Sequence, residues 1–305
     1  MQIRLMKRCT RTLIYFIISF SICFIIGRIL LDMIWSKIYF DNGKQILQFV
    51  KVSNESKIQP KNGFLFCFVL TDKKYHKTRI PALEQTWLPN CDAHHYYSNS
   101  AEGMEKLPVH ELFNFLPISY WKLFWKARLA LYYTYTNVSK DFDWYLKSDD
   151  DSYFIIDRLK LYLKTFDPNI PHLIGYRLKR NYPNGYVSGG AGYILSREAL
   201  RQFATEAFEN SSICKYHPWE DLGISKCLNN LGIPTKDTRT KSLKQRFMPF
   251  SIDEHFYSKV PKEWIFDDMQ YTGFDIFHKE LISFHHLKPS EVRLIHGLIT
   301  RINSD

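Results

Sequence analysis

Three consecutive carboxylates, Asp149 to Asp151, directly follow the stretch DWYLKS, which is typical of a buried strand. Such close like charges repel one another unless a cation lies among them, and carboxylate oxygens suit hard ions such as Mg²⁺ and Mn²⁺. In open α/β sheets, ligands bind at the carboxyl ends of strands. A metal there could bridge a carboxylate and the phosphates of a nucleotide, neutralising charge on a departing diphosphate. The triplet therefore indicates nucleotide-sugar chemistry; the alternative is a solvated acidic turn or the N-cap of a helix beginning near Ile156.

A second pair of carboxylates, Glu220 and Asp221, stands at the start of a predicted helix in the stretch PWEDLGISKCL. One of them could act as the general base for a hydroxyl nucleophile. The alternative is that both only stabilise the positive end of the helix dipole. The spacing alone does not separate these two interpretations.

Glycines and histidines supply two further candidate groups. The stretch YVSGGAGYILS holds Gly189, Gly190 and Gly192, which would let the backbone approach a ligand closely or would merely form a bulge. The late stretch SFHHLKP contains the adjacent histidines His285 and His286. A single histidine is more often structural, but an imidazole can complete the ligand shell of an ion such as Mn²⁺.

Alternating strands and helices are expected to position these groups. Buried-strand patterns cover residues 63–71, 93–98, 143–148 and 172–178, and a Gly-rich turn followed by a strand covers residues 185–196. Helices are expected before residue 87, from residue 197, and at residues 121–136, 156–166 and 220–231. This alternation predicts an α/β domain with a mostly parallel central sheet flanked by helices.

The N-terminal segment predicts where the chain is placed. Basic residues within the first eleven positions precede an apolar stretch that begins at Leu13 and contains Arg28. Since no small-residue cleavage site follows it, we expect an uncleaved signal anchor, with a cleaved signal peptide as the alternative. The expected organisation is a cytoplasmic tail (1–11), a signal-anchor transmembrane helix (12–31), a stem (32–62) and a luminal domain (63–305).

Composition bounds the class of protein and its partners. With 305 residues, 45% of them hydrophobic, the chain can build one large core. The net charge of +10 would suit nucleic acid, an anionic membrane or an anionic substrate. The body of the chain has neither a nucleic-acid motif nor a dense basic run, so we expect no nucleic-acid partner.

The cysteines and sequons fit an exported domain. An oxidising lumen favours two disulfides among the four cysteines outside the N-terminal segment. Three pairings are open, with free thiols as the alternative; we prefer Cys67–Cys91 and Cys214–Cys227 because they close short loops. N-glycosylation sequons occur at Asn54, Asn137 and Asn210.

Together these motifs resemble the β1,3-galactosyltransferases of glycosyltransferase family 31, and among them the core 1 enzymes. The resemblance is carried by FCFVLT, TWLPNC, SYWK, DWYLKSDDDSYF, GYVSGGAGYILSREAL, WEDLGISKC, DTR and SFHH, which occur in the family's order. It implies a GT-A fold, a single-pass type II protein of the Golgi membrane and an inverting, Mn²⁺-dependent transfer. The implied donor is UDP-galactose, and the implied acceptor is N-acetylgalactosamine (GalNAc) α-linked to Ser or Thr of a glycoprotein.

The resemblance also implies roles for individual residues, and it supports the two local disulfides. Asp221, or less favourably Glu220, would deprotonate the 3-hydroxyl of the acceptor. The implied metal ligands are Asp149, Asp151 and His285; the donor side is Leu70, Thr71, Lys122, Asp149 and Asp150; the acceptor side is Trp219, Glu220, Tyr193, Gly189 and Gly190.

Two alternatives to this function stay open. One is a related, fringe-like β1,3-glycosyltransferase with another donor or acceptor, since Met248 stands where the family commonly has a histidine and Ile276 and Phe277 lie near a usual cysteine pair. The other is an inactive luminal chaperone of a galactosyltransferase, although such family members lack an intact aspartate triplet. The sequence allows a homodimer without predicting one.

Overall fold

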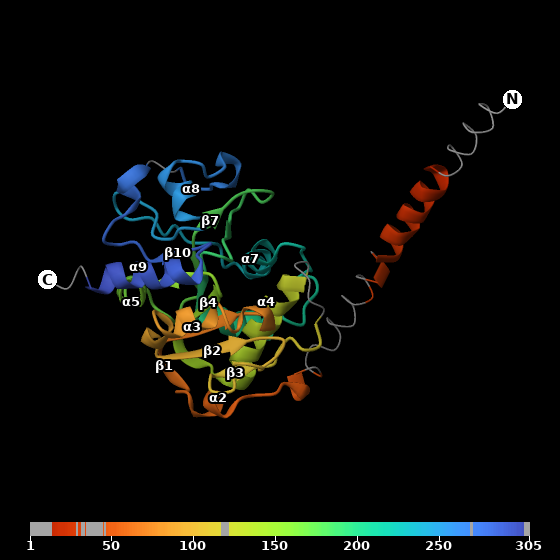
Figure 1. Ribbon diagram of the computed structural model, residues 1–305, viewed down its shortest axis with the longest axis horizontal. Coiled ribbons are helices and arrows are strands. Elements are labelled where there is room, and N and C mark those ends of the chain that lie inside the picture. Colours follow the sequence, from red (N-terminus) through yellow and green to blue (C-terminus); the bar gives the residue numbers. More distant parts are fainter. Residues whose placement is uncertain are drawn as a thin grey trace. The chain divides into compact units, whose positions relative to one another are not determined.

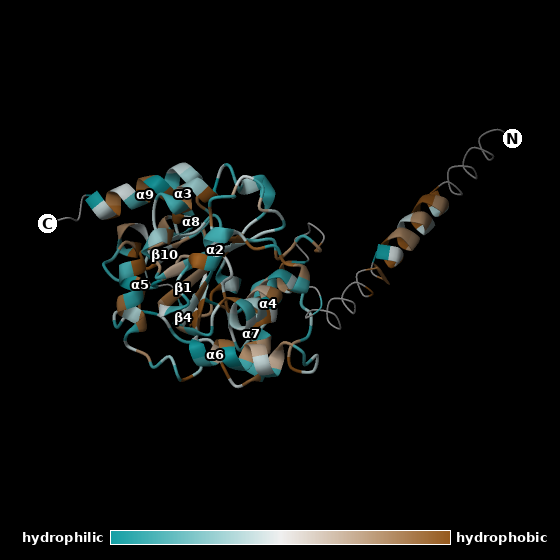
Figure 2. Ribbon diagram, turned by 90° about the horizontal axis from the view of Figure 1, so that it is seen from below, coloured by the Kyte–Doolittle hydropathy of each residue, from teal (hydrophilic) through white to brown (hydrophobic). Residues whose placement is uncertain are grey.

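The computed structural model describes residues 14–28, 30–31, 34, 45, 47–116, 122–268 and 271–301. The chain forms two compact units, residues 1–45 and 46–305. In the first unit residues 14–28 are helical, and their side chains are mostly apolar (Figure 2). Among the described residues, no helix combines the length and apolar character needed to cross a bilayer. The expected tail, the first two residues of the expected anchor and its residue 29 lie outside the described residues, so the anchor stays a prediction.

A six-stranded sheet forms the centre of the second unit (Figure 1). Its order is β3 (Val109–His110), β2 (Ala93–Tyr97), β1 (Asn62–Leu70), β4 (Asp141–Asp149), β9 (Tyr193–Ser196) and β6 (Leu173–Gly175). The first four strands are parallel, whereas β9 is antiparallel to both of its neighbours. The predicted α/β class is therefore confirmed, and the antiparallel β9 makes the sheet mixed.

Helices cover both faces of this sheet because its central strands are apolar on both sides. In β1, every residue from Leu65 to Leu70 is buried. One face packs in a single core with α3 (Ile80–Glu84), α5 (Ile156–Leu163) and α9 (Pro289–Arg301). Figure 2 shows α4 (Leu123–Tyr133), α6 (Arg197–Gln202) and α7 (Glu220–Asn230) on the other side.

The second unit begins earlier than the expected luminal domain. The short helix α2 (Asn54–Ile58) is capped by Ser53, whose hydroxyl donates to the carbonyl of Leu107 at 2.8 Å. The backbone N–H of Ser53 also donates to the carbonyl of Val109 at 3.0 Å. The last part of the segment predicted as a stem thus packs against β3, and its earlier part stays a prediction.

Two small sheets complete the unit. The predicted strand 172–178 is divided, because β6 ends at Gly175 and β7 (Arg177–Leu178) pairs instead with β8 (Tyr186–Val187). The other small sheet joins β5 (Tyr153–Phe154) to β10 (Ser283–Phe284), antiparallel. Since β5 follows the aspartate triplet and β10 precedes the two histidines, this pairing brings distant parts of the sequence together.

Candidate active site

The aspartate triplet lies where β4 ends, beside the end of β1. Asp149 is in register with Leu70 of β1, so the carboxyl ends of the two parallel strands meet. The backbone N–H of Thr71 donates to the carbonyl of Tyr97 at 3.0 Å, and its hydroxyl donates to Asp150 at 2.7 Å. The structure thus places Leu70 and Thr71, two of the predicted donor-side residues, next to the carboxylates.

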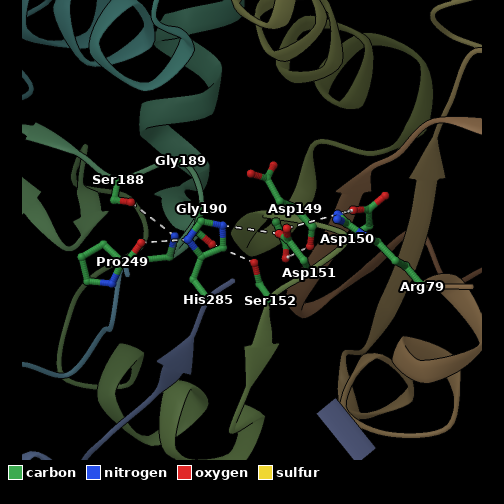
Figure 3. A network of polar contacts seen from close by, with 12 residues as sticks. Arg79, Asp149, Asp150, Asp151, Ser152, Ser188, Gly189, Gly190, Pro249 and His285 are labelled. Carbon is green, nitrogen blue, oxygen red and sulfur yellow. Dashed lines mark hydrogen bonds and ion pairs between the residues drawn. The ribbon is translucent and has the colours of Figure 1, made fainter. Parts of the chain in front are cut away.

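Asp149, Asp151 and His285 form a cluster that can hold a metal ion. One ligand atom from each residue lies within 4.8 Å of the other two. Figure 3 shows His285 and Asp151 facing each other, with Nε2 of the imidazole 3.4 Å from a carboxylate oxygen. Two carboxylates and an imidazole are a donor set that suits Mn²⁺.

A hydrogen bond of the other ring nitrogen fixes the orientation and the tautomer of His285. Nδ1 lies 2.8 Å from the carbonyl oxygen of Pro249, which can only accept, so this nitrogen carries a proton. Nε2 is thereby left with a lone pair directed at the cluster, as in many metal-binding histidines. Burial lowers the pKa of His285, but the hydrogen bond and charge of Asp151 outweigh burial and raise it above its ordinary value.

The glycine turn makes room for two of these side chains. A Cβ added to Gly190 would lie 1.9 Å from the imidazole of His285, and one added to Gly189 would lie 2.5 Å from the carboxylate of Glu220. The free space at these glycines is therefore used by the protein's own side chains. Their predicted part in acceptor binding stays a prediction.

Asp150 points away from the metal cluster toward Thr71 and Arg79. The guanidinium of Arg79 donates to Asp150 and, at 3.1 Å, to Asp151 (Figure 3). Burial raises the pKa of Asp150 to about 6, although Thr71 and Arg79 act to lower it. Arg79 was not identified from the sequence, where an isolated arginine in a predicted helix gives no signal.

Lys147 is a second functional cation that the sequence did not reveal. Its ammonium group lies 2.8 Å from Asp149, 3.4 Å from Glu220 and 3.3 Å from the carbonyl of Gly189. The side chain is almost fully buried. Burial lowers the pKa of Lys147, but the charges of Asp149 and Glu220 outweigh it, so the pKa lies above its ordinary value and the group stays charged.

The two carboxylates at the start of α7 have different surroundings. Glu220 is buried; one oxygen faces Lys147 and the other accepts from the hydroxyl of Tyr193 at 2.8 Å. Asp221 is partly exposed, and accepts from the backbone N–H of Gly189 at 3.2 Å and of Leu222 at 2.8 Å. Burial raises the pKa of Glu220 to about 7, and burial also raises that of Asp221. Asp221 is therefore the more exposed carboxylate of the pair.

A family model described as Fringe-like matches residues 61–244, which include the sheet, the triplet and α7. The chain belongs to the Fringe-like family. It is 28% identical over 247 residues to glycoprotein-N-acetylgalactosamine 3-beta-galactosyltransferase 1 of Xenopus laevis, covering 79% of this chain and 67% of that protein. The resemblance inferred from the motifs is therefore confirmed.

Two other relatives of this Fringe-like chain match over a shorter stretch of it. The mouse beta-1,3-glucosyltransferase is 30% identical over 184 residues, covering 57% of this chain and 35% of that protein. Human chondroitin sulfate synthase 3 is 25% identical over 192 residues, covering 55% of this chain and 21% of that protein. The chain thus spans only a minor part of these two relatives.

Two predicted residues lie at the margins of the Fringe-like site. Lys122 is buried at the beginning of α4, next to residues 117–121, which lie outside the described residues. Its donor-side role therefore stays a prediction. Trp219 immediately precedes α7 and stacks on Trp264, a partner that the sequence did not indicate.

Both predicted disulfides are present in the Fringe-like domain. Cys67–Cys91 ties β1 to the turn before β2, and Cys214–Cys227 ties α7 to the segment that precedes it. The sequon residues Asn54, Asn137 and Asn210 are all exposed. Each can be reached by a glycosylating enzyme, and glycosylation itself stays a prediction.

Proposed function

We propose that this chain transfers galactose from UDP-galactose to the 3-hydroxyl of GalNAc α-linked to Ser or Thr of glycoproteins, with inversion at the anomeric carbon. The observation that carries the proposal is the convergence of a metal-binding cluster and a partly exposed carboxylate, Asp221, on the two sides of the Gly189–Gly190 turn. The similarity to the Xenopus galactosyltransferase supports the choice of donor and acceptor.

Each residue has a part in this mechanism. Asp149, Asp151 and His285 would hold Mn²⁺, which when bound supplies positive charge next to the leaving diphosphate. Asp221 takes the proton of the acceptor hydroxyl as this oxygen attacks the anomeric carbon. Glu220 is held by Lys147 and Tyr193 and keeps the start of α7 in place. A single in-line displacement inverts the anomeric centre and needs no covalent intermediate.

The proposed location follows from the same resemblance. We propose a single-pass type II protein of the Golgi membrane whose catalytic domain faces the lumen. The two disulfides and the exposed sequons are compatible with this oxidising compartment.

A transfer assay tests the activity. The full-length chain is given Mn²⁺, a GalNAc-α-peptide and, in parallel, UDP-galactose, UDP-glucose or UDP-GlcNAc. We expect product from UDP-galactose, loss of product with EDTA, and no Mn²⁺-dependent product from Asp151→Asn. Glucose is the second candidate because the mouse beta-1,3-glucosyltransferase is 30% identical over 184 residues. Product from UDP-glucose or UDP-GlcNAc alone would overturn the galactose assignment, and no transfer or hydrolysis with any donor would favour a chaperone.

A further inference from the structure

Arg180 lies over a pair of stacked tryptophans next to the active site. The rings of Trp219 and Trp264 have centroids 5.8 Å apart and planes 21° from parallel. The guanidinium carbon of Arg180 lies 4.4 Å from the ring centroid of Trp264 and 5.9 Å from that of Trp219. Both tryptophans are partly exposed and Arg180 is exposed. We call these three residues the Trp–Arg platform.

The backbone around the platform is fixed from two sides. The N–H of Lys179 donates to the carbonyl of Trp264 at 2.9 Å, which ties the β7–β8 turn to the segment that carries this ring. The hydroxyl of Tyr182, in the same turn, accepts from the side chain of Asn229 of α7 at 2.9 Å. Because Trp219 directly precedes Glu220 at the start of α7, the platform is held beside the proposed catalytic carboxylates.

Arg180 and Arg177, three positions earlier, differ in their ion-pair partners. Arg177 donates to both carboxylate oxygens of Asp267 and forms a further ion pair with Asp237. Within the described part of the chain, no carboxylate forms an ion pair with Arg180. A cation–π contact holds a guanidinium over a ring without using its N–H groups, so these stay available to a planar anion.

We propose that the Trp–Arg platform binds a carboxylate carried by the acceptor, next to the sugar that receives the transferred residue. This inference rests on the proposed function for the position of the acceptor. The tryptophans offer apolar contact to the acceptor, and Arg180 offers paired donors to its carboxylate. An acidic side chain of a glycopeptide and a uronic acid of a glycan both supply this group.

Binding of matched acceptor pairs tests the inference without a donor. Calorimetry with the full-length chain compares a GalNAc-α-peptide carrying Glu beside the glycosylated Thr with the same peptide carrying Gln. It also compares a disaccharide ending in glucuronic acid with the same disaccharide ending in glucose. We expect the acidic member of at least one pair to bind about fivefold more tightly, as for an exposed charge-assisted pair, and the preference to shrink as salt is raised.

Two charge-removing variants one residue apart make the test specific. Arg180→Gln should abolish the preference, whereas Lys179→Gln, which removes an equal charge, should keep it. A preference in the peptide pair alone, or in the disaccharide pair alone, supports the inference and names the source of the carboxylate. Equal Kd within both pairs, or equal loss in both variants, overturns it. Transfer to the neutral peptide, measured alongside, reports separately on the proposed function.

Discussion

The buried Lys147 and the partly exposed Asp149 form an ion pair, 2.8 Å long, that reaches from the interior of the sheet to the metal cluster. The same ammonium group contacts Glu220 at the start of α7. One cation therefore sets the position of a metal ligand and of the helix that carries the proposed base. It also offsets part of the repulsion within the triplet.

Replacing Lys147 by Met should uncouple these two parts of the site. The ion pair between Lys147 and Glu220 is buried, and breaking such a pair by removing one partner costs about 3–5 kcal/mol because the carboxylate is left without a cation. We expect a lower urea midpoint. We also expect a higher Mn²⁺ concentration for half-maximal transfer, because Asp149 loses the contact that holds it in place and this outweighs the removal of a repelling charge. The double variant Lys147→Met/Glu220→Gln removes one of the stranded charges, so it should regain stability without regaining metal affinity. Wild-type metal affinity in Lys147→Met would contradict this role.

Asp221→Asn should remove turnover and leave UDP binding nearly intact. The amide keeps the size of the side chain but cannot take the proton of the acceptor hydroxyl, which costs about 10²–10⁴-fold in rate. Single-turnover transfer and UDP calorimetry measure the two properties. Glu220→Gln is the matched comparison, and we expect it to lose less turnover because Glu220 bonds inward to Lys147 and Tyr193. Normal turnover in Asp221→Asn would show that the base lies elsewhere.

Replacing Arg79 by Met should increase the amount by which Mn²⁺ and UDP stabilise the folded protein against thermal unfolding. Arg79 screens Asp150 and Asp151 from each other when no metal is bound. Without it the free protein is destabilised, by about 1–3 kcal/mol for lost charged hydrogen bonds, while the bound metal replaces the lost charge. Thermal unfolding with and without Mn²⁺–UDP measures the difference. Arg293→Met is the control, since Arg293 contacts Gln85 and a carbonyl, and an equal ligand effect in the two variants would refute the screening role.

Buried histidines in β2 and β3 should make the domain less stable in acid. A nitrogen of His95 lies 2.7 Å from one of His110, whose other nitrogen lies 2.9 Å from the hydroxyl of Tyr133. Burial, reinforced by Lys61, lowers the pKa of His110 to about 3, and burial with His110 lowers that of His95. Unfolded histidines take up protons near their ordinary pKa while the folded ones do not, so stability is lost as pH falls below about 6.5.

The measurable quantity is the slope of the unfolding free energy against pH. Each such histidine contributes up to about 1.4 kcal/mol of unfolding free energy per pH unit. Urea unfolding between pH 7.5 and pH 5 should therefore show a smaller slope for His110→Phe than for the wild-type chain. The same slope in both would exclude His110 as a source of the pH dependence.

The features that are set by residues close together in the sequence could be predicted from it. The strands that became β1 and β4 are continuous buried runs, and the disulfides close short loops. The amphipathic spacing of Val292, Ile295 and Ile299 could also have indicated α9, which was missed.

The cations of the site could not be predicted, because their partners are distant in sequence. Lys147 lies on the same face of its strand as Tyr145 and Asp149, and this pattern gives no sign that it is buried against Glu220. Arg79 meets Asp150 only because β1 and β4 are neighbours in the sheet. The sequence therefore indicated the carboxylates and His285 that the structure brings together, and the structure was needed to find Lys147 and Arg79 beside them.

The pairing of β5 with β10 determines when a growing chain can complete its set of candidate metal ligands. Tyr153 and Phe154 leave the ribosome long before Ser283 and Phe284, which bring His285 to the triplet. A nascent chain can form the parallel strands of the sheet without having a complete set of metal ligands. The cluster of Asp149, Asp151 and His285 can therefore close only after residue 285 has been made and β10 has paired with β5.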